Sequence, residues 1–377
     1  MFSLGFYYFF FNKRTSLISR GSTFRIVADA TARFDYGLTY PLTYKFQIPL
    51  SSSGIQVWKK DSPGGSYIQL TEKTSPDIFN GIEAVRFDYT LGYAYVSILF
   101  PQTSDSFYVK FIRNNGDGLT GVTFLNFTQY YDNRVSAAVF TMDDCGVVQL
   151  SDFETASDTF ASKGVWVTAG FFHMGDFTAE TWENIQSKID NGYIEPASHS
   201  MSHLPMSDDF NVGESRQTIL DNLTMPPLNK KGSKEYLFAW ITPLSKYSEV
   251  MQAKVGEYKY LTNVAGFGTY VYEGIFPVWD EISGLYEHWD RYAFAESVSL
   301  ATMNAQFDSD HAAGKIYHLG LHPQNVSWRA DGDFPLHLDY VKNRTDVWYV
   351  GMGHLMVYRY ATEHIKIEII NTNFDEI

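Results

Sequence analysis

The order of apolar and polar positions divides this chain of 377 residues into two patterns that meet near residue 130. In the first, short segments alternate between apolar and polar side chains, and turn-forming clusters such as 62–66 separate them. Short alternating strands with no helical period between them favour an antiparallel β-sandwich. We therefore predict an all-β domain over residues 23–130. Its expected strands are 24–28, 44–48, 55–58, 84–89 and 107–112.

The second pattern alternates continuous apolar strands with helical stretches. The expected strands are 135–141, 164–172 and 193–197, and the expected helices are 151–162 and 178–191. Strands and helices in this rhythm build parallel βαβ units. We predict an α/β fold for residues 131–377, a distorted (β/α) barrel with about seven strands. The alternating segment 364–370 is expected either to cap this barrel or to begin a further β domain.

The N-terminal segment 1–22 contains a short apolar run, 2–11. This run is too short to span a bilayer, and it lacks the preceding positive charge and the cleavage site of a signal peptide. We interpret the segment as a remnant export signal or a misassigned start, and we expect an extracytoplasmic location (secreted, periplasmic or cell-surface). A single cysteine, Cys145, excludes an internal disulfide framework.

The overall charge narrows the class of partner. The chain carries 29 basic and 43 acidic residues, a net charge of −14. Nucleic acids and anionic membrane surfaces both require basic patches, so we expect neither as a partner. Aromatic residues make up 17% of the chain, which suits β-strands and also fits the stacking of tyrosine and tryptophan on sugar rings.

Candidate chemistry follows two of the predicted strands. Asp143 and Asp144 follow one apolar strand, and His199 and His203 follow another. Two imidazoles four residues apart can reach one cation, while one carboxylate adds a third ligand and its neighbour serves as a base. Either pair alone is weak evidence in a chain with 10 histidines and 43 acidic residues. Active sites gather at the carboxyl ends of parallel strands, so this placement favours a mononuclear metal hydrolase.

With these residues in view, the segment 133–361 resembles the polysaccharide deacetylase family, the NodB-homology domain of carbohydrate esterase family 4. The family's first motif is Thr-Phe-Asp-Asp-Gly, and residues 141–145 match it at three of five positions. Its second motif, His-Ser/Thr-x-x-His, is matched in full by residues 199–203. The strand and helix between the two motifs keep the family's spacing. The first 130 residues lie outside the resemblance.

The third motif, Arg-x-Pro-Tyr-Gly, is degenerate in this chain. Residues 243–245 align with its last three positions, and Trp240 or Ile241 occupies the place of the arginine. A late strand, 317–322, ends in a histidine as the corresponding strand of the family does.

The resemblance implies a metal site and its two proton carriers. Asp144, His199 and His203 would hold a divalent metal, most simply Zn²⁺, with Co²⁺, Ni²⁺ or Mn²⁺ as alternatives. Asp143 would be the general base that takes a proton from the attacking water. His322 would protonate the leaving amine.

The remaining implied roles concern the substrate. The backbone N–H of Leu244 would bind the oxyanion of the reaction, with Pro243 and Trp240 beside it. His318, earlier on the same strand as the proposed acid, is the reserve candidate for the acid role. The stretch 270–292, rich in tyrosine and tryptophan, is expected to shape the choice of substrate.

Two departures from the family affect this prediction. Without the arginine of the third motif, Asp143 lacks the partner that orients it and keeps it ionised. Arg291 or Lys246 could replace that arginine, and the sequence does not decide between them. Cys145 stands where the family has a glycine, and we expect a buried thiol that takes no part in the chemistry.

These observations leave three functions open. The first is a metal-dependent hydrolase that removes N-acetyl groups from an amino-sugar polymer or oligomer (chitin-, peptidoglycan- or poly-N-acetylglucosamine-like) and releases acetate. The second is a carbohydrate-binding protein with a degenerate deacetylase domain. The third is an O-acetyl esterase acting on acetylated xylan. The non-ligand Asp143 favours an enzyme, because a protein that only binds sugar has no use for a base.

Overall fold

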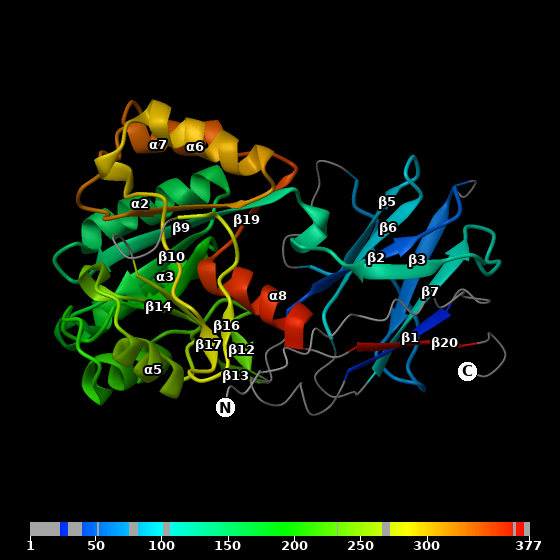
Figure 1. Ribbon diagram of the computed structural model, residues 1–377, viewed down its shortest axis with the longest axis horizontal. Helices are drawn as coiled ribbons and strands as arrows, with labels where there is room; N and C mark the ends of the chain where they lie inside the picture. Colours follow the sequence, from blue (N-terminus) through cyan, green and yellow to red (C-terminus); the bar gives the residue numbers. More distant parts are fainter. Residues whose placement is uncertain are drawn as a thin grey trace, which may run out of the picture.

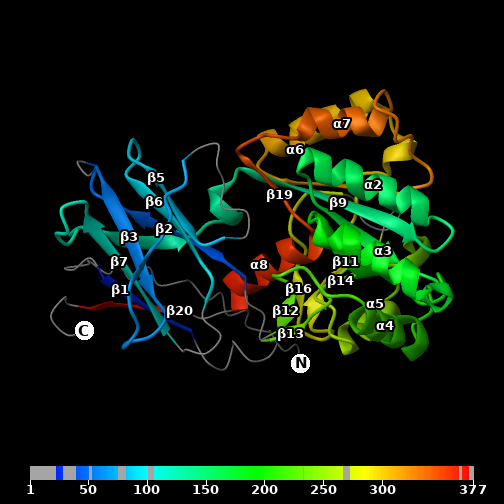
Figure 2. The ribbon, with the colours of Figure 1, turned by 180° about the vertical axis from the view of Figure 1, so that it is seen from behind.

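The computed structural model describes residues 23–28, 40–50, 53–74, 82–100, 106–231, 233–265, 272–364 and 367–372. These residues form a β-sandwich and a curled parallel sheet covered by helices, which lie side by side (Figures 1 and 2). Both parts agree with the fold predicted from the hydrophobic pattern. The segment 1–22 lies outside the described residues.

The sandwich consists of two antiparallel sheets, with strand orders β20-β1-β7-β3-β4 and β5-β6-β2-β8. Their strands are β1 (Thr23–Ala28), β2 (Leu42–Gln47), β3 (Ile55–Lys60), β4 (Ile68–Gln69), β5 (Ala84–Asp88), β6 (Tyr93–Ile98), β7 (Ser106–Arg113), β8 (Thr123–Phe127) and β20 (Ile367–Thr372). Large aromatic side chains fill the space between the sheets: Phe46 on β2, for example, packs at 5.1 Å from the ring of Phe24 and 5.0 Å from that of Phe111.

The end of the chain returns to the sandwich, which neither expectation for segment 364–370 foresaw. Strand β20 pairs antiparallel with β1 over its whole length, from Thr23 opposite Thr372 to Ala28 opposite Ile367. The other edge of β1 pairs with β7. An alternating segment gains most where it can hydrogen-bond to an open strand edge, and β1 offers that edge. The sandwich therefore contains both the first and the last described strands.

The second part is a seven-stranded parallel sheet within the described residues, with strand order β15-β14-β11-β10-β9-β18 and β19 also paired to β9. Its strands are β9 (Ser136–Cys145), β10 (Val167–Phe171), β11 (Ile194–Ser198), β14 (Ala239–Ile241), β15 (Thr262–Val264), β18 (Ile316–Leu321) and β19 (Val347–Tyr349). The crossing helices are α2 (Leu150–Lys163), α3 (Ala179–Asp190), α4 (Ser215–Asn222), α5 (Glu249–Glu257), α6 (Leu300–Ala312), α7 (Asp333–Val341) and α8 (Met352–His364). Two short hairpins, β12 (Lys230–Lys231) with β13 (Lys234–Glu235) and β16 (Trp279–Asp280) with β17 (Leu285–Tyr286), complete this part.

Strand β9 is the longest of these strands, and its residues 136–143 are all buried, which explains its continuous apolar run. The strands run away from the sandwich, so their carboxyl ends lie at the far end of the molecule (Figure 1). That end carries both motifs singled out in the sequence.

The helix α8 lies between the sandwich and the parallel sheet in both views (Figures 1 and 2). Just before β9, the short 3₁₀ helix η1 (Tyr131–Asn133) places Asp132 between two arginines. The carboxylate of Asp132 accepts from Arg86 of the sandwich at 3.0 Å and from Arg134 at 3.2 Å. Because Asp132 is fully buried, this ion-pair group ties the two parts together at their junction.

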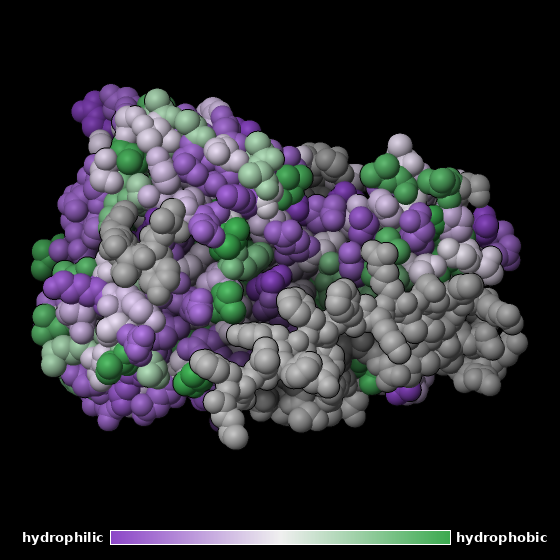
Figure 3. Space-filling view, viewed as in Figure 1, coloured by the Kyte–Doolittle hydropathy of each residue, from purple (hydrophilic) through white to green (hydrophobic). Residues whose placement is uncertain are grey.

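The visible surface of the parallel-sheet part is mostly hydrophilic, with hydrophobic side chains scattered over it (Figure 3). Among the described residues, no helix combines the length and the hydrophobicity that crossing a bilayer requires.

Candidate metal centre

The three candidate ligands meet at the carboxyl ends of neighbouring strands. Asp144 lies near the end of β9, and His199 is the first residue after β11. The backbone N–H of His199 still donates to the carbonyl oxygen of Phe171 on β10 at 2.8 Å, which fixes its position at the sheet edge. His203 follows after a tight turn. The sheet order places β10 between β9 and β11, so sequence segments some fifty residues apart converge here.

The ligand atoms converge on a single point. The Nε2 atoms of His199 and His203 lie 3.3 Å and 2.9 Å from Oδ1 of Asp144. One ligand atom from each of the three residues lies within 4.8 Å of the other two. A two-imidazole, one-carboxylate set of this kind matches the preference of Zn²⁺ and similar divalent ions for three protein ligands and an open position. The structure thus shows a candidate metal site made of the residues predicted from the sequence.

The hydrogen bonds of His199 direct its Nε2 toward Asp144. Its Nδ1 donates to the carbonyl oxygen of Ile241 at 2.8 Å, because a carbonyl can only accept. In the neutral ring, Nε2 then carries a lone pair that faces Oδ1 of Asp144 at 3.3 Å. Because both atoms are acceptors, a proton or a metal ion must lie between them. A backbone carbonyl that fixes the tautomer of a ligating histidine is typical of metal sites.

The charge state of Asp144 agrees with this arrangement. Burial alone would raise the pKa of this carboxyl, but the hydrogen bonds and charges of His199 and His203 hold it below the usual value. Asp144 is therefore an anion throughout the neutral range, as a metal ligand must be.

The backbone at this edge of the sheet is strained. Asp144, Ser200, His203 and Leu244 all have positive φ angles, between 55° and 69°, although none is glycine. Such conformations cost of order 1–3 kcal/mol each and persist where the surrounding structure holds them, which is often at functional sites. Their concentration in three loops around Asp144 supports a functional site at this place.

Asp143 is not a ligand; it pairs with an arginine. Its Oδ2 accepts from Nη1 of Arg291 at 2.9 Å, and both side chains are almost completely buried, with 4% and 0% of their surfaces exposed. The other oxygen, Oδ1, is buried and has no hydrogen-bond partner among the described residues. Of the two replacements suggested for the absent motif arginine, Arg291 is therefore the one that reaches Asp143. Lys246 lies on an exposed loop position.

His322 follows β18 and faces the same centre. Its Nε2 lies 3.8 Å from Oδ2 of Asp144, and its Nδ1 donates to Oε1 of Glu296 at 2.5 Å. Burial lowers the pKa of His322, but the hydrogen bond to Glu296 and the negative charges of Asp143, Glu296 and Asp144 outweigh it and raise this pKa above the usual value. This histidine is suited to holding a proton near neutral pH.

Two predicted residues do not reach the site. Trp240 is fully buried, packs on Tyr260 and donates from Nε1 to Thr242 at 3.1 Å, so the prediction that it contacts substrate is wrong. The sequence shows an apolar residue at this position but not that the core already surrounds it. His318, the reserve acid, is also fully buried, with Nε2 3.2 Å from the hydroxyl of Thr141.

The remaining predicted residues lie at the carboxyl ends of β14 and β9. Pro243, Leu244 and Ser245 form the short 3₁₀ turn η4 after β14. Pro243 has no N–H, Leu244 has a positive φ of 55°, and the N–H of Ser245 donates to the carbonyl oxygen of Thr242 at 3.2 Å. Cys145 is buried, and burial raises the pKa of its thiol well above the usual value, so it stays protonated. It is not part of the ligand group among the described residues.

Sequence reasoning missed two residues of the centre. Glu296, on the 3₁₀ helix η5 (Ala295–Ser297), holds His322, and Gln324 donates from Nε2 to Oδ2 of Asp144 at 3.3 Å. Gln324 follows His322 by two positions and could have been found from that spacing. Glu296 lies 26 residues earlier and gives no local signal.

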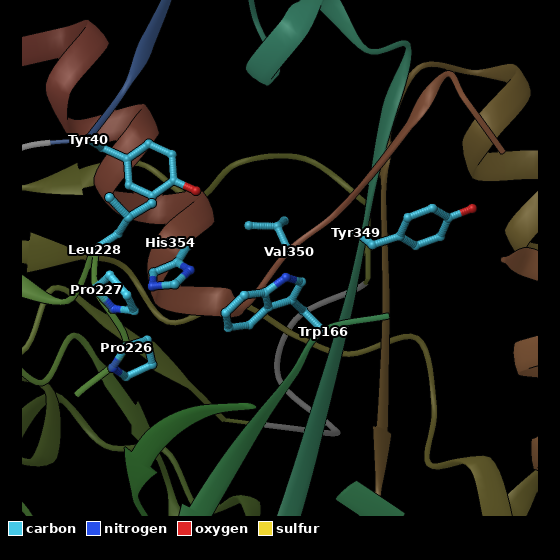
Figure 4. Close-up of a pocket in the computed structure, with 8 residues that line it drawn as sticks. All are labelled: Tyr40, Trp166, Pro226, Pro227, Leu228, Tyr349, Val350 and His354. Carbon is cyan, nitrogen blue, oxygen red and sulfur yellow. The ribbon is translucent and has the colours of Figure 1, made fainter. Parts of the chain in front are cut away.

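A pocket of the described part lies away from the metal ligands. A pocket of about 180 Å³ opens between Tyr40 of the sandwich and Trp166, Tyr349 and His354 of the parallel-sheet part (Figure 4). Trp166 directly precedes β10, so this pocket is at the amino ends of the strands, opposite the metal ligands. It therefore plays no part in the chemistry at Asp144.

Comparisons with known proteins give distant structural likenesses. No family model matches the sequence, and no curated protein matches it. A protein assigned as a polysaccharide deacetylase from Mycobacterium smegmatis is 13% identical over 65% of this chain and 97% of that one, with a TM-score of 0.43. A family 4 acetyl xylan esterase from Clostridium thermocellum, in complex with a cobalt ion, is 14% identical over 58% and 90% of the two chains, with a TM-score of 0.36.

The matches also include a protein described as a pseudoenzyme. This member of carbohydrate esterase family 4 from Bacillus anthracis is 9% identical over 59% of this chain and 65% of that one, with a TM-score of 0.35. These structures come from the family that the motifs resemble. At such identities and TM-scores, however, the likeness does not carry any neighbour's activity over to this chain.

Proposed function

We propose that the protein is a metal-dependent hydrolase that removes N-acetyl groups from an amino-sugar polymer or oligomer and releases acetate. One observation carries this proposal: beside the group Asp144, His199 and His203 lies a carboxylate, Asp143, that is not a ligand and is held by a buried arginine. A metal-binding protein without catalysis has no need for that second carboxylate. Ligands, base and acid together are the parts that amide hydrolysis needs.

The three ligands define what a metal would supply. A divalent ion held by Asp144, His199 and His203 would act as a Lewis acid toward water and an acyl carbonyl. Zn²⁺ suits this set of two imidazoles and one carboxylate best, and Co²⁺, Ni²⁺ and Mn²⁺ accept the same donor types.

The protein's own groups move the protons. Asp143 presents its unpartnered Oδ1 as the atom that accepts a proton from the attacking water. His322, held by Glu296, gives a proton to the leaving nitrogen. The N–H of Leu244, at the start of η4, donates to the oxyanion that forms on the acyl carbon. The base and the acid thus come from β9 and β18, which pair side by side in the sheet.

The alternatives differ in what they ask of Asp143 and of the substrate. A binding protein with a degenerate deacetylase domain would not require the buried pair of Asp143 with Arg291, and that pair favours an enzyme. An O-acetyl esterase would use the same residues, because ester and amide cleavage need the same base and oxyanion donor. We further propose an extracytoplasmic location, since amino-sugar polymers of this kind surround cells.

A substrate panel distinguishes these functions. Acetate release by the Zn²⁺-loaded protein would be measured with N-acetylglucosamine oligomers, peptidoglycan and acetylated xylan. We expect release from at least one of the two N-acetylated substrates. Release from xylan alone would establish the esterase, and no release from any of them by a protein with one metal per chain would favour the binding function.

A further inference from the structure

We propose that Arg291 is the residue that positions the catalytic base, Asp143. Arg291 lies on the segment between β17 and η5, whereas β14, where the resemblance would place an arginine, offers no cation. This inference rests on the proposed hydrolase function. It concerns how Asp143 is oriented, because the arginine binds one carboxylate oxygen and leaves the other without a hydrogen-bond partner among the described residues.

The burial of the pair makes this contact necessary. Arg291 and Asp143 are both shielded from water, and a buried carboxylate without a partner is strongly destabilised. Among the described residues, Arg291 is the one cation with an ion pair to Asp143. One hydrogen bond, from Nη1 to Oδ2, joins the two side chains, while Nε and Nη2 of Arg291 are buried without a partner among the described residues. Oδ1 of Asp143 also has no protein partner in this part of the chain, which leaves it for the water.

The backbone around Arg291 lies along strand β18. The N–H of Tyr292 donates to the carbonyl oxygen of His318 at 2.8 Å, and the N–H of Gly320 donates to that of Ala293 at 2.9 Å. The two residues that follow Arg291 are therefore hydrogen-bonded to the strand that leads to His322. The same segment continues into η5 and Glu296, so it carries the partner of the base and the partner of the acid.

The space for the guanidinium group depends on a glycine. A Cβ atom at Gly320 would lie 2.6 Å from Cδ and 2.8 Å from Nη1 of Arg291, closer than such atoms approach. On another side, the guanidinium lies 4.7 Å from the ring centre of Phe294. Gly320 and Phe294 thus flank the guanidinium in the position where it meets Asp143.

Strand β14 cannot supply this arginine from the place that the family resemblance suggests. Trp240 and Ile241 are both fully buried and apolar there. Trp240 packs on Tyr260, and the side chain of Ile241 closes against Gly170 on β10. The cation that pairs with Asp143 is therefore Arg291, which follows Asp143 by 148 residues in the chain.

The test compares Arg291→Lys and Arg291→Ala with the unchanged protein in kcat, KM and bound metal. We expect kcat to fall about 100-fold or more in both variants, at nearly unchanged KM and with one Co²⁺ or Zn²⁺ still bound, because an unoriented base loses general-base catalysis. Added guanidinium at millimolar concentration should restore part of the kcat of Arg291→Ala but not of Asp143→Asn. Gly320→Ala, which displaces the guanidinium without removing it, should also lower kcat.

The matched control is Arg134→Lys, a buried arginine that pairs with Asp132 at 3.2 Å far from the centre. This variant should lose stability but keep kcat. Full activity of Arg291→Ala, or loss of its metal, would overturn the inference. If the unchanged protein cleaves no substrate, the proposed function fails and the pair is tested by unfolding. Arg291→Met and Asp143→Asn should then be non-additive in unfolding free energy, and additive effects would overturn the pairing.

Discussion

Two neighbouring carboxylates acquire different tasks because the backbone changes direction between them. Along a regular strand, consecutive side chains point to opposite faces. At Asp144, inside β9, the φ angle is 59° and the pairing with β10 shifts in register between Met142 and Cys145, so the regular alternation is interrupted where this carboxylate meets the two histidines. Asp143, one position earlier, still points to Arg291. One local strain thus separates a ligand from a base.

The ligand role is tested with a pair of histidine variants. His199→Ala should lose the bound metal, because it removes an imidazole whose tautomer is fixed by Ile241. His173→Ala is the control: this nearby histidine contacts the carbonyl oxygen of Ser202 rather than Asp144. Metal content measured by mass spectrometry should be about one per chain in the control. Stoichiometric metal in His199→Ala would show that the ligand set is wrong.

A buried carboxylate outside the metal centre, Glu195 on β11, lies against the start of α8. Its Oε2 accepts from the hydroxyl of Thr168 and from the N–H of Gly353, both at 2.8 Å. Burial raises the pKa of Glu195 to about 7, and these hydrogen bonds only partly oppose the shift. The folded state therefore holds this proton more tightly than the unfolded chain, whose pKa is 4.5.

This shift gives a pH dependence of stability. The contribution of Glu195 is fully present below pH 4.5 and is lost as the pH rises through about 7. Between pH 5 and pH 8 it should lower the free energy of unfolding by about 2 kcal/mol, and Glu195→Gln should lack this part of the decrease. Urea unfolding of both proteins at the two pH values measures the difference. Parallel pH profiles would show that Glu195 ionises normally.

At the scale of elements, the site is the product of strand ends. Strands β9, β10 and β11 are adjacent and parallel, so the loops that follow β9 and β11 meet above β10. The apolar runs and the helices between them predicted parallel βαβ units from the sequence. They also predicted that Asp144, His199 and His203 lie at the carboxyl ends of parallel strands.

Other elements could not be predicted in this way. Strand β6 does not alternate between buried and exposed residues, since five of its six residues are buried. Such a run does not distinguish a buried strand from a buried helix. The partnership of Arg291 with Asp143 spans 148 positions and depends on how the segment before η5 lies along β18. The sequence does not distinguish a tryptophan that stacks on a sugar ring from one in the core, and only the packing in the structure shows that Trp240 is buried.

The returning strand β20 makes a prediction about the sandwich. Deleting residues 367–372 exposes the edge of β1 and removes an antiparallel ladder six residues long. At roughly 0.5 kcal/mol for each hydrogen bond lost, the sandwich should lose about 3 kcal/mol of stability. Thermal unfolding measures this loss, and acetate release should be unaffected because the site is in the other part. An unchanged melting temperature would contradict the pairing.

At the scale of the whole molecule, the two parts are joined at one end of the sheet and the chemistry lies at the other. The ion pairs of Asp132 and the helix α8 lie at the junction, whereas the metal ligands follow the opposite ends of the same strands. The described sandwich therefore lies away from the metal centre. The acidic net charge of −14 suits a neutral or cationic substrate at that centre better than an anionic one.

The most direct test of the account is acetate release from N-acetylglucosamine oligomers by the Zn²⁺-loaded protein and by Asp143→Asn, each with and without a chelator. We predict release by the unchanged protein that the chelator abolishes. We also predict a rate at least about 100-fold lower for Asp143→Asn, which should still bind one metal per chain. A normal rate in Asp143→Asn, or release that persists after the metal is removed, would contradict the assignment of base and metal on which the proposed function depends.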